Sequence, residues 1–370
     1  MKKLGFGCMR LPLTNPDDPS TVDHEKFCEM VDEFLNRGFT YFDTAYMYHN
    51  GKSEIAVREA LVKRHPRDSF LLADKLPLFV IKNEGDKERI FDEQFEKCGV
   101  DYFDYYLLHN VNSSSIETAN KFDCFEFIKQ KKAEGKLRHI GFSYHDNAEN
   151  LDKILTEHPE MEFVQIQLNY LDYETAYIQS RKCYEVIKKH GKKAWIMEPV
   201  KGGMLANPIE EVKNMLNSHL PNATPSSWAI RFAASHNEVA MVLSGMSNME
   251  QLCDNTDNMS AFVPLTDEEK QILAKAADII NAKTAVPCTA CAYCVEGCPM
   301  NIAIPEYFSI YNSAKQRGER SQNHVIYYRN YSKNRGKASD CIGCKNCESA
   351  CPQHIEISKF LKDVADLMEN

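Results

Sequence analysis

The sequence predicts an α/β protein: a closed (β/α)8 TIM barrel followed by a small, mainly helical C-terminal domain. Short runs of β-branched and aromatic residues alternate with amphipathic helical patterns over the first 280 residues, which is typical of βα units around a parallel sheet. Eight of the 14 cysteines then follow residue 287. We therefore expect a barrel domain over 1–280 and a cysteine-rich domain over 281–370.

Eight segments of the barrel region have the composition of strands, and helical patterns lie between them. The predicted strands are Lys3–Gly7, Thr40–Asp43, Phe70–Lys75, Tyr102–His109, His139–Ser143, Phe163–Gln167, Ala194–Glu198 and Val239–Ser244. The predicted helices include Asp23–Arg37, Ser53–Lys63, Lys87–Cys98, Ala119–Glu134, Asn150–His158 and Tyr177–Lys189. This number of strands in about 250 residues matches a (β/α)8 barrel. A doubly wound open sheet is the alternative, and it is disfavoured because no G-x-G-x-x-G follows the first strand.

Composition excludes several classes of partner. The 370 residues carry 44 Lys and Arg against 53 Asp and Glu, a net charge of −9, which disfavours nucleic acid. Apolar runs such as that from Val239 to Leu243 are too short to cross a membrane. The first residues lack the apolar core of a secretory signal, so we expect a cytoplasmic location. Clustered cysteines in a reducing compartment are more often metal ligands than disulfides.

The eight late cysteines form two strings with the spacing C-x2-C-x2-C-x3-C-P, which is that of bacterial [4Fe–4S] ligation. Paired zinc sites are the alternative, but zinc explains neither the third spacing nor the repeated Cys-Pro. In two-cluster ferredoxins the fourth cysteine of each string binds the other cluster. We therefore predict two [4Fe–4S] clusters, one held by Cys288, Cys291, Cys294 and Cys351 and the other by Cys341, Cys344, Cys347 and Cys298.

Forty-two residues, 299 to 340, separate the two strings, and two helices are predicted within them, Ile304–Lys315 and Gln322–Tyr331. The arrangement resembles the helical ferredoxin modules of iron–sulfur subunits in multi-component reductases. Between residues 311 and 339 the chain is basic, with Glu319 the single acid against Lys315, Arg317, Arg320, Arg329, Lys333, Arg335 and Lys337. This face either docks an acidic electron carrier, such as ferredoxin or flavodoxin, or offsets the charge of the clusters, or is merely solvated.

Polar residues end three successive strands of the predicted barrel. The second strand ends in Asp43, with Tyr48 five residues later, the third in Lys75 and the fourth in His109. Each alone has an ordinary structural explanation, as a cap, a core aromatic, a surface charge or a satisfied interior histidine. Chemistry in such barrels occurs at the C-terminal ends of the strands, so their joint occurrence predicts an active site.

The sequence resembles aldo-keto reductases over about residues 1 to 260. The resemblance is carried, in order, by Gly38-Phe-Thr-Tyr-Phe-Asp-Thr-Ala45, Tyr48, Ser53-Glu54, Leu72-Ala-Asp-Lys75, Leu107-Leu-His109 and Ile140-Gly-Phe-Ser143. It implies that Asp43, Tyr48, Lys75 and His109 form a catalytic tetrad beside an extended nicotinamide dinucleotide. The implied reaction is the reduction of a small-molecule carbonyl, or the reverse oxidation of an alcohol.

The chemistry of the four residues suits carbonyl reduction. Tyr48 would donate the proton, and we expect the Lys75 ammonium to lower the pKa of its phenol towards the working range. Asp43 would hold Lys75 in place. His109 would donate a hydrogen bond to the carbonyl oxygen and accommodate its developing charge.

The resemblance also implies contacts with the dinucleotide, NADP(H) or NAD(H). Ser143 and Gln165 match the residues that hold the nicotinamide carboxamide, although Tyr144 replaces the usual Asn. The pyrophosphate loop would comprise Met197, Pro199, Val200, Lys201 and Gly202. The adenosine end would lie at Gly245, Met246, Gln251, Asp254 and Asn255. NADPH-preferring relatives usually carry a basic residue where Gly245 and Gln251 stand, so the choice of dinucleotide stays open, with Lys201 a candidate to compensate.

Three functions remain compatible with both domains. The first is a reductase that exchanges electrons with a partner through its clusters, and the second is a carbonyl reductase whose clusters are structural or redox-sensing. The third is a non-enzymatic electron-transfer or regulatory subunit on an inactive barrel. The complete tetrad disfavours the third, because an inactive site has no reason to keep all four groups.

Overall fold

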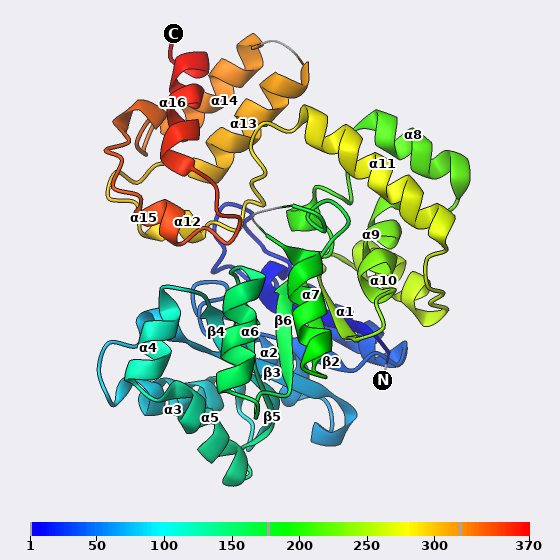
Figure 1. Ribbon diagram of the computed structural model, residues 1–370, viewed down its shortest axis with the longest axis vertical. Helices are drawn as coiled ribbons and strands as arrows, with labels where there is room; N and C mark the ends of the chain where they lie inside the picture. Colours follow the sequence, from blue (N-terminus) through cyan, green and yellow to red (C-terminus); the bar gives the residue numbers. More distant parts are fainter. Residues whose placement is uncertain (1, 176–177, 318–319) are drawn as a thin grey trace. The chain divides into compact units, whose positions relative to one another are not determined.

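A computed structural model describes residues 2–175, 178–317 and 320–370, and eight parallel strands in it close into a barrel in chain order, with β8 pairing with β1 (Figure 1). The strands are β1 (Leu4–Gly7), β2 (Tyr41–Asp43), β3 (Leu71–Pro77), β4 (Phe103–Val111), β5 (Leu137–Tyr144), β6 (Phe163–Gln167), β7 (Lys193–Met197) and β8 (Val239–Gly245). Each lies within a few residues of its predicted position. The predicted barrel is confirmed.

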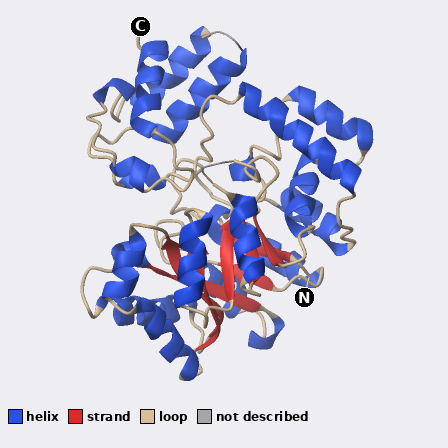
Figure 2. Cartoon of the chain, in the orientation of Figure 1, coloured by secondary structure: helices blue, strands red, loops and turns tan. Residues whose placement is uncertain are grey.

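Helices surround the strands, as Figure 2 shows in blue and red. In chain order they are α1 (His24–Asn36), α2 (Ser53–Val57), α3 (Asp86–Cys98), α4 (Ser115–Lys121), α5 (Cys124–Ala133), α6 (Ala148–Glu157), α7 (Ser180–Lys189), α9 (Pro225–Ala234) and α10 (Met249–Ser260). Short turns are η1 (Cys8–Arg10), η2 (Arg58–Val62), η3 (Arg67–Ser69) and η4 (Leu78–Val80). Side-chain oxygens begin three of the helices, with Asp23, Asn147 and Asn248 accepting from backbone N–H groups of α1, α6 and α10.

Large side chains fill the interior of the barrel. Tyr41, Leu107, Phe163, Trp195 and Met241 come from five different strands and pack into one buried cluster. Such a layer makes the barrel a packed core and not a pore, so the polar groups of a site are confined to its ends. The strand register aligns Gly7 with both Asp43 and Gly245, which brings the C-terminal ends of β1, β2 and β8 together.

The chain packs into two compact units. The barrel unit comprises residues 1–174, 179–200 and 226–266, and the second unit comprises 175–178, 201–225 and 267–370. The helices of the second unit are α8 (Glu210–His219), α11 (Asp267–Lys283), α12 (Tyr293–Glu296), α13 (Ile304–Arg317), α14 (Gln322–Ser332), α15 (Asn346–Ser349) and α16 (Ile357–Met368), with turns η5 (Lys201–Gly203) and η6 (Ala338–Asp340). The division at residue 280 expected from the sequence stays a prediction, because units defined by packing need not coincide with domains.

The second unit is mainly helical, as expected, and has its own apolar core. Tyr307 and Phe308 of α13 pack with Tyr328 of α14 and with Leu361 and Val364 of α16. The helix patterns at 304–315 and 322–331 are confirmed by α13 and α14. Among the described residues, none of the helices is both long and apolar enough for a bilayer crossing.

One predicted helix is wrong. The pattern at Ala119–Glu134 predicted a single helix, but the chain breaks into α4 and α5 at Phe122 and Asp123. Asp123 has a φ of 49°, a left-handed conformation that a continuous helix does not contain. The predicted start of another helix, Tyr177, lies outside the described residues.

Candidate active site and metal centres

The four residues at the predicted strand ends lie together. Lys75 Nζ donates hydrogen bonds to Asp43 Oδ1 at 2.5 Å and to the backbone carbonyl of Thr44 at 2.7 Å. The hydroxyl oxygen of Tyr48 lies 3.4 Å from the same ammonium. The ring of His109 stands edge-on to that of Tyr48, with 6.1 Å between centroids. Residues from β2, β3, β4 and the loop after β2 therefore surround one point.

Several polar atoms of this group are left without an internal partner. Asp43, Lys75 and His109 are buried, whereas Tyr48 is partly exposed. Within the described part of the chain, neither Asp43 Oδ2 nor His109 Nδ1 has a hydrogen-bond partner. Buried polar atoms are rarely left unpaired in folded proteins, and such exceptions often mark a functional site.

The two residues expected at the nicotinamide are neighbours. Ser143 on β5 pairs in register with Gln165 on β6, and both are buried. Ser143 Oγ accepts a hydrogen bond from the backbone N–H of Asn110 at 2.8 Å. Gln165 Oε1 has no partner among the described residues. This buried acceptor fits the N–H group of a carboxamide, so the pair suits the nicotinamide end of a dinucleotide.

The residues expected at the adenosine end follow β8. Gly245 ends that strand, Met246 is buried behind it, and Gln251 lies in the first turn of α10. Asn255 Nδ2 donates to Ser244 Oγ at 3.0 Å, and Asp254 Oδ2 accepts from Ser226 Oγ at 2.8 Å. The structure thus gathers these five residues at the end of β8 and on the helix that follows.

The segment after β7 is divided between the two units. Met197 ends β7, and Pro199 and Val200 still belong to the barrel unit. Lys201 and Gly202 belong to the second unit, where Lys201 Nζ is buried and donates to Gln353 Oε1 at 3.1 Å. Lys201 is therefore held by a residue near the second cysteine string, a position that the sequence did not predict.

The eight late cysteines line two separate pockets in the second unit. Cys288, Cys291, Cys294 and Cys351 line the first, which we call the first cysteine site. Cys298, Cys341, Cys344 and Cys347 line the second cysteine site. Each site combines three cysteines of one string with the fourth of the other, which is the crossed arrangement expected from the spacing. Four thiol groups around one pocket fit the ligand set of a cubane cluster.

Residues 3–278 match the model of the aldo/keto reductase family. The chain belongs to this family. Residues 287–356 match a 4Fe-4S dicluster domain, so the family's barrel is followed here by an iron–sulfur domain.

Relatives and solved structures agree with this assignment. The uncharacterised oxidoreductase YqkF of Bacillus subtilis is 23% identical over 74% of this chain and 92% of its own length. A probable aldo-keto reductase from Glycine max is 30% identical, over 39% of this chain and 41% of its own length. The holo form of an aldo-keto reductase from Bacillus halodurans is 25% identical with a TM-score of 0.60, covering 74% of this chain and 91% of that one. An aldo-keto reductase from Klebsiella pneumoniae in complex with NADPH is 19% identical with a TM-score of 0.57, covering 75% and 90%.

The electrostatics of the aldo/keto reductase barrel correct one expectation. Burial raises the pKa of Tyr48 well above its usual value, and the charge of Asp43 adds to the rise. The prediction that Lys75 lowers the pKa of this phenol is therefore wrong for this structure. Because Asp43 lies 2.5 Å from the ammonium, its negative charge offsets much of the effect of Lys75 at the phenol. Tyr48 is a protonated phenol at neutral pH.

His109 is held in its neutral form. Burial lowers its pKa well below the usual value, and the neighbouring charges of Lys75 and His145 lower it further. Burial also raises the pKa of Asp43, an effect that Lys75 opposes. A neutral imidazole can orient a carbonyl through an N–H group, but it does not supply the proton as an imidazolium would.

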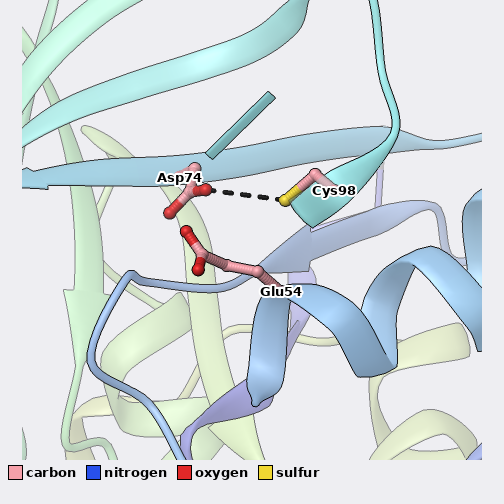
Figure 3. A group of neighbouring side chains, drawn as sticks. All are labelled: Glu54, Asp74 and Cys98. Carbon is pink, nitrogen blue, oxygen red and sulfur yellow. Dashed lines mark hydrogen bonds between the residues drawn. The ribbon is translucent and has the colours of Figure 1, made fainter. Parts of the chain in front are cut away.

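A second buried group includes Asp74, the residue that precedes Lys75 on β3. Figure 3 shows Glu54, Asp74 and Cys98, whose oxygen and sulfur atoms lie within 4.8 Å of one another. Burial raises the pKa of Asp74 well above its usual value, and the charge of Glu54 adds to this. Lys97 Nζ lies 3.2 Å from Glu54 Oε2. The pKa values of both carboxyl groups are raised, chiefly by burial, and the Lys97 ammonium offsets their charge, so we assign this group no cation.

Two further residues lie at the site although no sequence pattern predicted them there. Phe79, which follows β3 and is 44% exposed, stands edge-on to His109 with 5.8 Å between ring centroids. The stem of Arg10 packs against Gly245, within 3.1 to 3.2 Å of where a Cβ on that glycine would stand. The pairing of β1 with β8 makes this contact, and it places a basic residue beside the expected adenosine end.

Proposed function

We propose that this protein catalyses nicotinamide-dependent reduction of a small-molecule carbonyl, or the reverse oxidation of an alcohol, and that its C-terminal domain carries two [4Fe–4S] clusters. The observation that carries the catalytic part is the contact of the Lys75 ammonium with both Asp43 and Tyr48. A phenol next to a fixed, charge-balanced ammonium is a proton donor whose conjugate base is stabilised at the moment it forms.

The four residues take separate roles in the proposed reaction. A bound reduced nicotinamide supplies the hydride that carbonyl reduction needs. Tyr48 gives its phenolic proton to the carbonyl oxygen as negative charge develops there, and Lys75 stabilises the phenolate that remains. Asp43 holds Lys75 in position. His109, which is neutral, orients the carbonyl oxygen by a hydrogen bond.

The dinucleotide contacts are proposed for Ser143 and Gln165 at the nicotinamide and for Gly245, Met246, Gln251, Asp254 and Asn255 at the adenosine end. The unpartnered Gln165 Oε1 supports the first assignment. The NADPH complex of the Klebsiella pneumoniae structure supports NADP(H) as the cofactor. Arg10, beside Gly245, is the candidate for pairing with a 2′-phosphate, because Gln251 Oε1 already accepts a hydrogen bond from the backbone of Ser247.

The clusters are proposed to exchange single electrons with a partner through the second cysteine site. Cys344 of that site is exposed, and the adjacent Ile342 is 64% exposed. Short distance to the surface is what one-electron transfer to another protein requires. We propose an acidic carrier such as ferredoxin or flavodoxin, in the cytoplasm, where thiolate ligands stay reduced.

Part of the predicted basic face is available for such a partner. Arg329 and Lys333 are exposed on and after α14. Arg335 instead lies 3.5 Å from Glu306, and Arg320 donates to the carbonyls of Leu367 and Asn370. The side chains of Arg317 and Glu319 lie outside the described residues.

The decisive experiment compares Tyr48→Phe with the wild type. We expect oxidation of NADPH or NADH with a panel of aldehydes, ketones and quinones to fall by about 100-fold or more, since a general acid contributes about that much. Nucleotide binding, followed by fluorescence, and iron content are expected to stay unchanged. Near-normal turnover of a substrate by the variant would refute the proposed proton donor.

A further inference from the structure

The two cysteine sites differ in the charges around them. The first cysteine site is lined by Thr289 and Gln353 in addition to its cysteines, and Gln353 accepts the hydrogen bond from Lys201 Nζ. Lys201 is only 1% exposed. A buried positive charge therefore adjoins this site.

The second cysteine site has no such buried cation in the described part of the chain. Its pocket is lined by Lys345, but that side chain is 70% exposed and lies 3.7 Å from Glu348. Water screens an exposed charge far more than a buried one. Arg335 donates to the carbonyl of Ile302, which lines this pocket, but it is 26% exposed and is balanced by Glu306 at 3.5 Å.

The backbone holds Lys201 in place at a conformational cost. Lys201 has a φ of 47°, a region that side-chain-bearing residues seldom adopt. Gly202 follows with a φ of 64°, and a Cβ on it would lie 2.3 Å from the carbonyl oxygen of Thr289. Strained conformations persist where the surrounding structure determines them, often at functional sites. Here the turn η5 is pressed against the chain between two cysteines of the first site.

We propose that Lys201 sets the cluster bound by Cys288, Cys291, Cys294 and Cys351 at the higher reduction potential of the two. The inference rests on the proposed binding of two clusters. Reduction adds one electron and no proton, so a cluster and its four thiolates become one unit more negative. A buried ammonium beside them stabilises the reduced form, and the net charge and solvent exposure around a cluster are known to set its potential. An electron that enters at the exposed second cluster would therefore reside, at equilibrium, on the first cluster.

The test is an anaerobic redox titration of the complete protein, with dithionite as reductant and electron spin resonance as readout. The wild type is expected to show two steps. Lys201→Met keeps the length of the side chain but removes its charge. It should lower the midpoint potential of the higher step. At a given potential, the ratio of reduced to oxidised first cluster should fall at least tenfold, which corresponds to a shift of 59 mV for one electron. The lower step should not move.

Lys345→Met is the matched control, because it removes an exposed lysine beside the second site. For both steps, the ratio of reduced to oxidised cluster at a given potential is expected to change less than tenfold. If Lys201→Met does not retain the first cluster, Gln353→Glu is tested in its place. This variant keeps Lys201 and adds a negative charge to the wall of the same site. That variant should lower the same step.

The proposal would be overturned if the two steps of the wild type had the same potential. It would also be overturned if the potential of the higher step stayed unchanged in the variant tested at the first site. A loss of affinity for NADPH or NADH in Lys201→Met with both potentials unchanged would overturn it too, since this would place the charge at the dinucleotide. Iron content separates failure of the premise from failure of the inference. A wild type with about four irons would disprove the two clusters themselves.

Discussion

The ammonium of Lys75 lies 2.5 Å from Asp43 Oδ1 and 3.4 Å from the hydroxyl oxygen of Tyr48. The shorter contact makes Lys75 primarily a partner of the carboxylate and only secondarily a neighbour of the phenol. In the proposed reaction, Tyr48 therefore keeps its proton until a substrate oxygen gains negative charge. The proposed site would thus have a protonated donor at rest and a cation in place to stabilise the phenolate after proton transfer.

Asp43→Asn tests the partnership with Lys75. The substitution leaves a buried ammonium without its counter-charge, so the free energy of unfolding is expected to fall by about 3 to 5 kcal/mol. Asp257→Asn is the control, since Asp257 pairs with Arg37 but its side chain is 71% exposed, and its loss should cost less than about 1 kcal/mol. Denaturant unfolding measures both. Equal effects would contradict a buried pair.

The pH dependence of turnover tests the protonation states of Tyr48 and His109. Reduction needs the protonated phenol, whose pKa is raised, so its rate should stay level from about pH 7 to about pH 10. His109 has a lowered pKa and stays neutral, so no inflection is expected near about pH 6.5. Stopped-flow rates of hydride transfer at saturating dinucleotide provide the measurement. A step near pH 6.5 that disappears in His109→Asn would show instead that this histidine titrates during catalysis.

The barrel and the grouping of four polar residues at its strand ends could be predicted because their signals are local. The runs that form β1 to β8 are buried and rich in apolar residues, and Asp43, Lys75 and His109 stand on the strands themselves. The crossed cysteine sites could also be predicted, since spacing alone indicates how the two strings combine. The helix break at Asp123 could not, because its left-handed φ occurs at a residue that is not glycine.

The environment of each group was beyond prediction from the sequence. The pKa of Tyr48 depends on burial and on how closely Asp43 approaches Lys75, and neither is encoded in residue spacing. Lys201 was expected at a pyrophosphate, but its partner Gln353 lies 152 residues away in the chain. Asp74 and Glu54 likewise meet from different elements, β3 and α2, and only the closed barrel brings them into contact.

Asp74→Asn tests whether the carboxyl group of Asp74 is protonated in the folded protein. The pKa of Asp74 is raised on folding, so between about pH 4 and its folded value the native state binds more protons than the unfolded state. Its contribution to stability is thus present below about pH 4 and is lost as the pH rises. Asparagine keeps a donor without titrating, so the variant should gain stability relative to the wild type between about pH 5 and about pH 8.

Asp86→Asn provides the control of opposite sign for this experiment. Hydrogen bonds from the backbone of Lys82 and Asn83 lower the pKa of Asp86 to about 2. Its contribution is present above about pH 4 and is lost as the pH falls towards about 2. Asp86→Asn should therefore be less stable than the wild type at neutral pH. Thermal unfolding of both variants at two pH values decides, and a loss of stability in Asp74→Asn that grows with pH would show that Asp74 is ionised in the native state.

Paired substitutions test the crossed arrangement of the cysteines. Cys288→Ala with Cys351→Ala removes two ligands from the same site, so about four irons should remain. Cys288→Ala with Cys341→Ala removes one ligand from each site and should damage both clusters. Iron analysis and visible absorbance of anaerobically purified protein distinguish the two. Equal loss of iron in the two double variants would instead show that each string binds its own cluster, because both pairs take one cysteine from each string.

Gly202→Ala tests the contact between η5 and the first cysteine site. The new Cβ would stand 2.3 Å from the carbonyl oxygen of Thr289, which lies between Cys288 and Cys291, so the loop must shift. We expect iron content to fall from about eight to about four as the first cluster is lost. Gly203→Ala is the matched control: its φ is 98°, but no other atom lies within 4 Å of its Cβ position. Gly203→Ala therefore introduces backbone strain without a steric clash, and the variant should keep both clusters. Full iron content in Gly202→Ala would mean that the loop adapts and that η5 does not support the site.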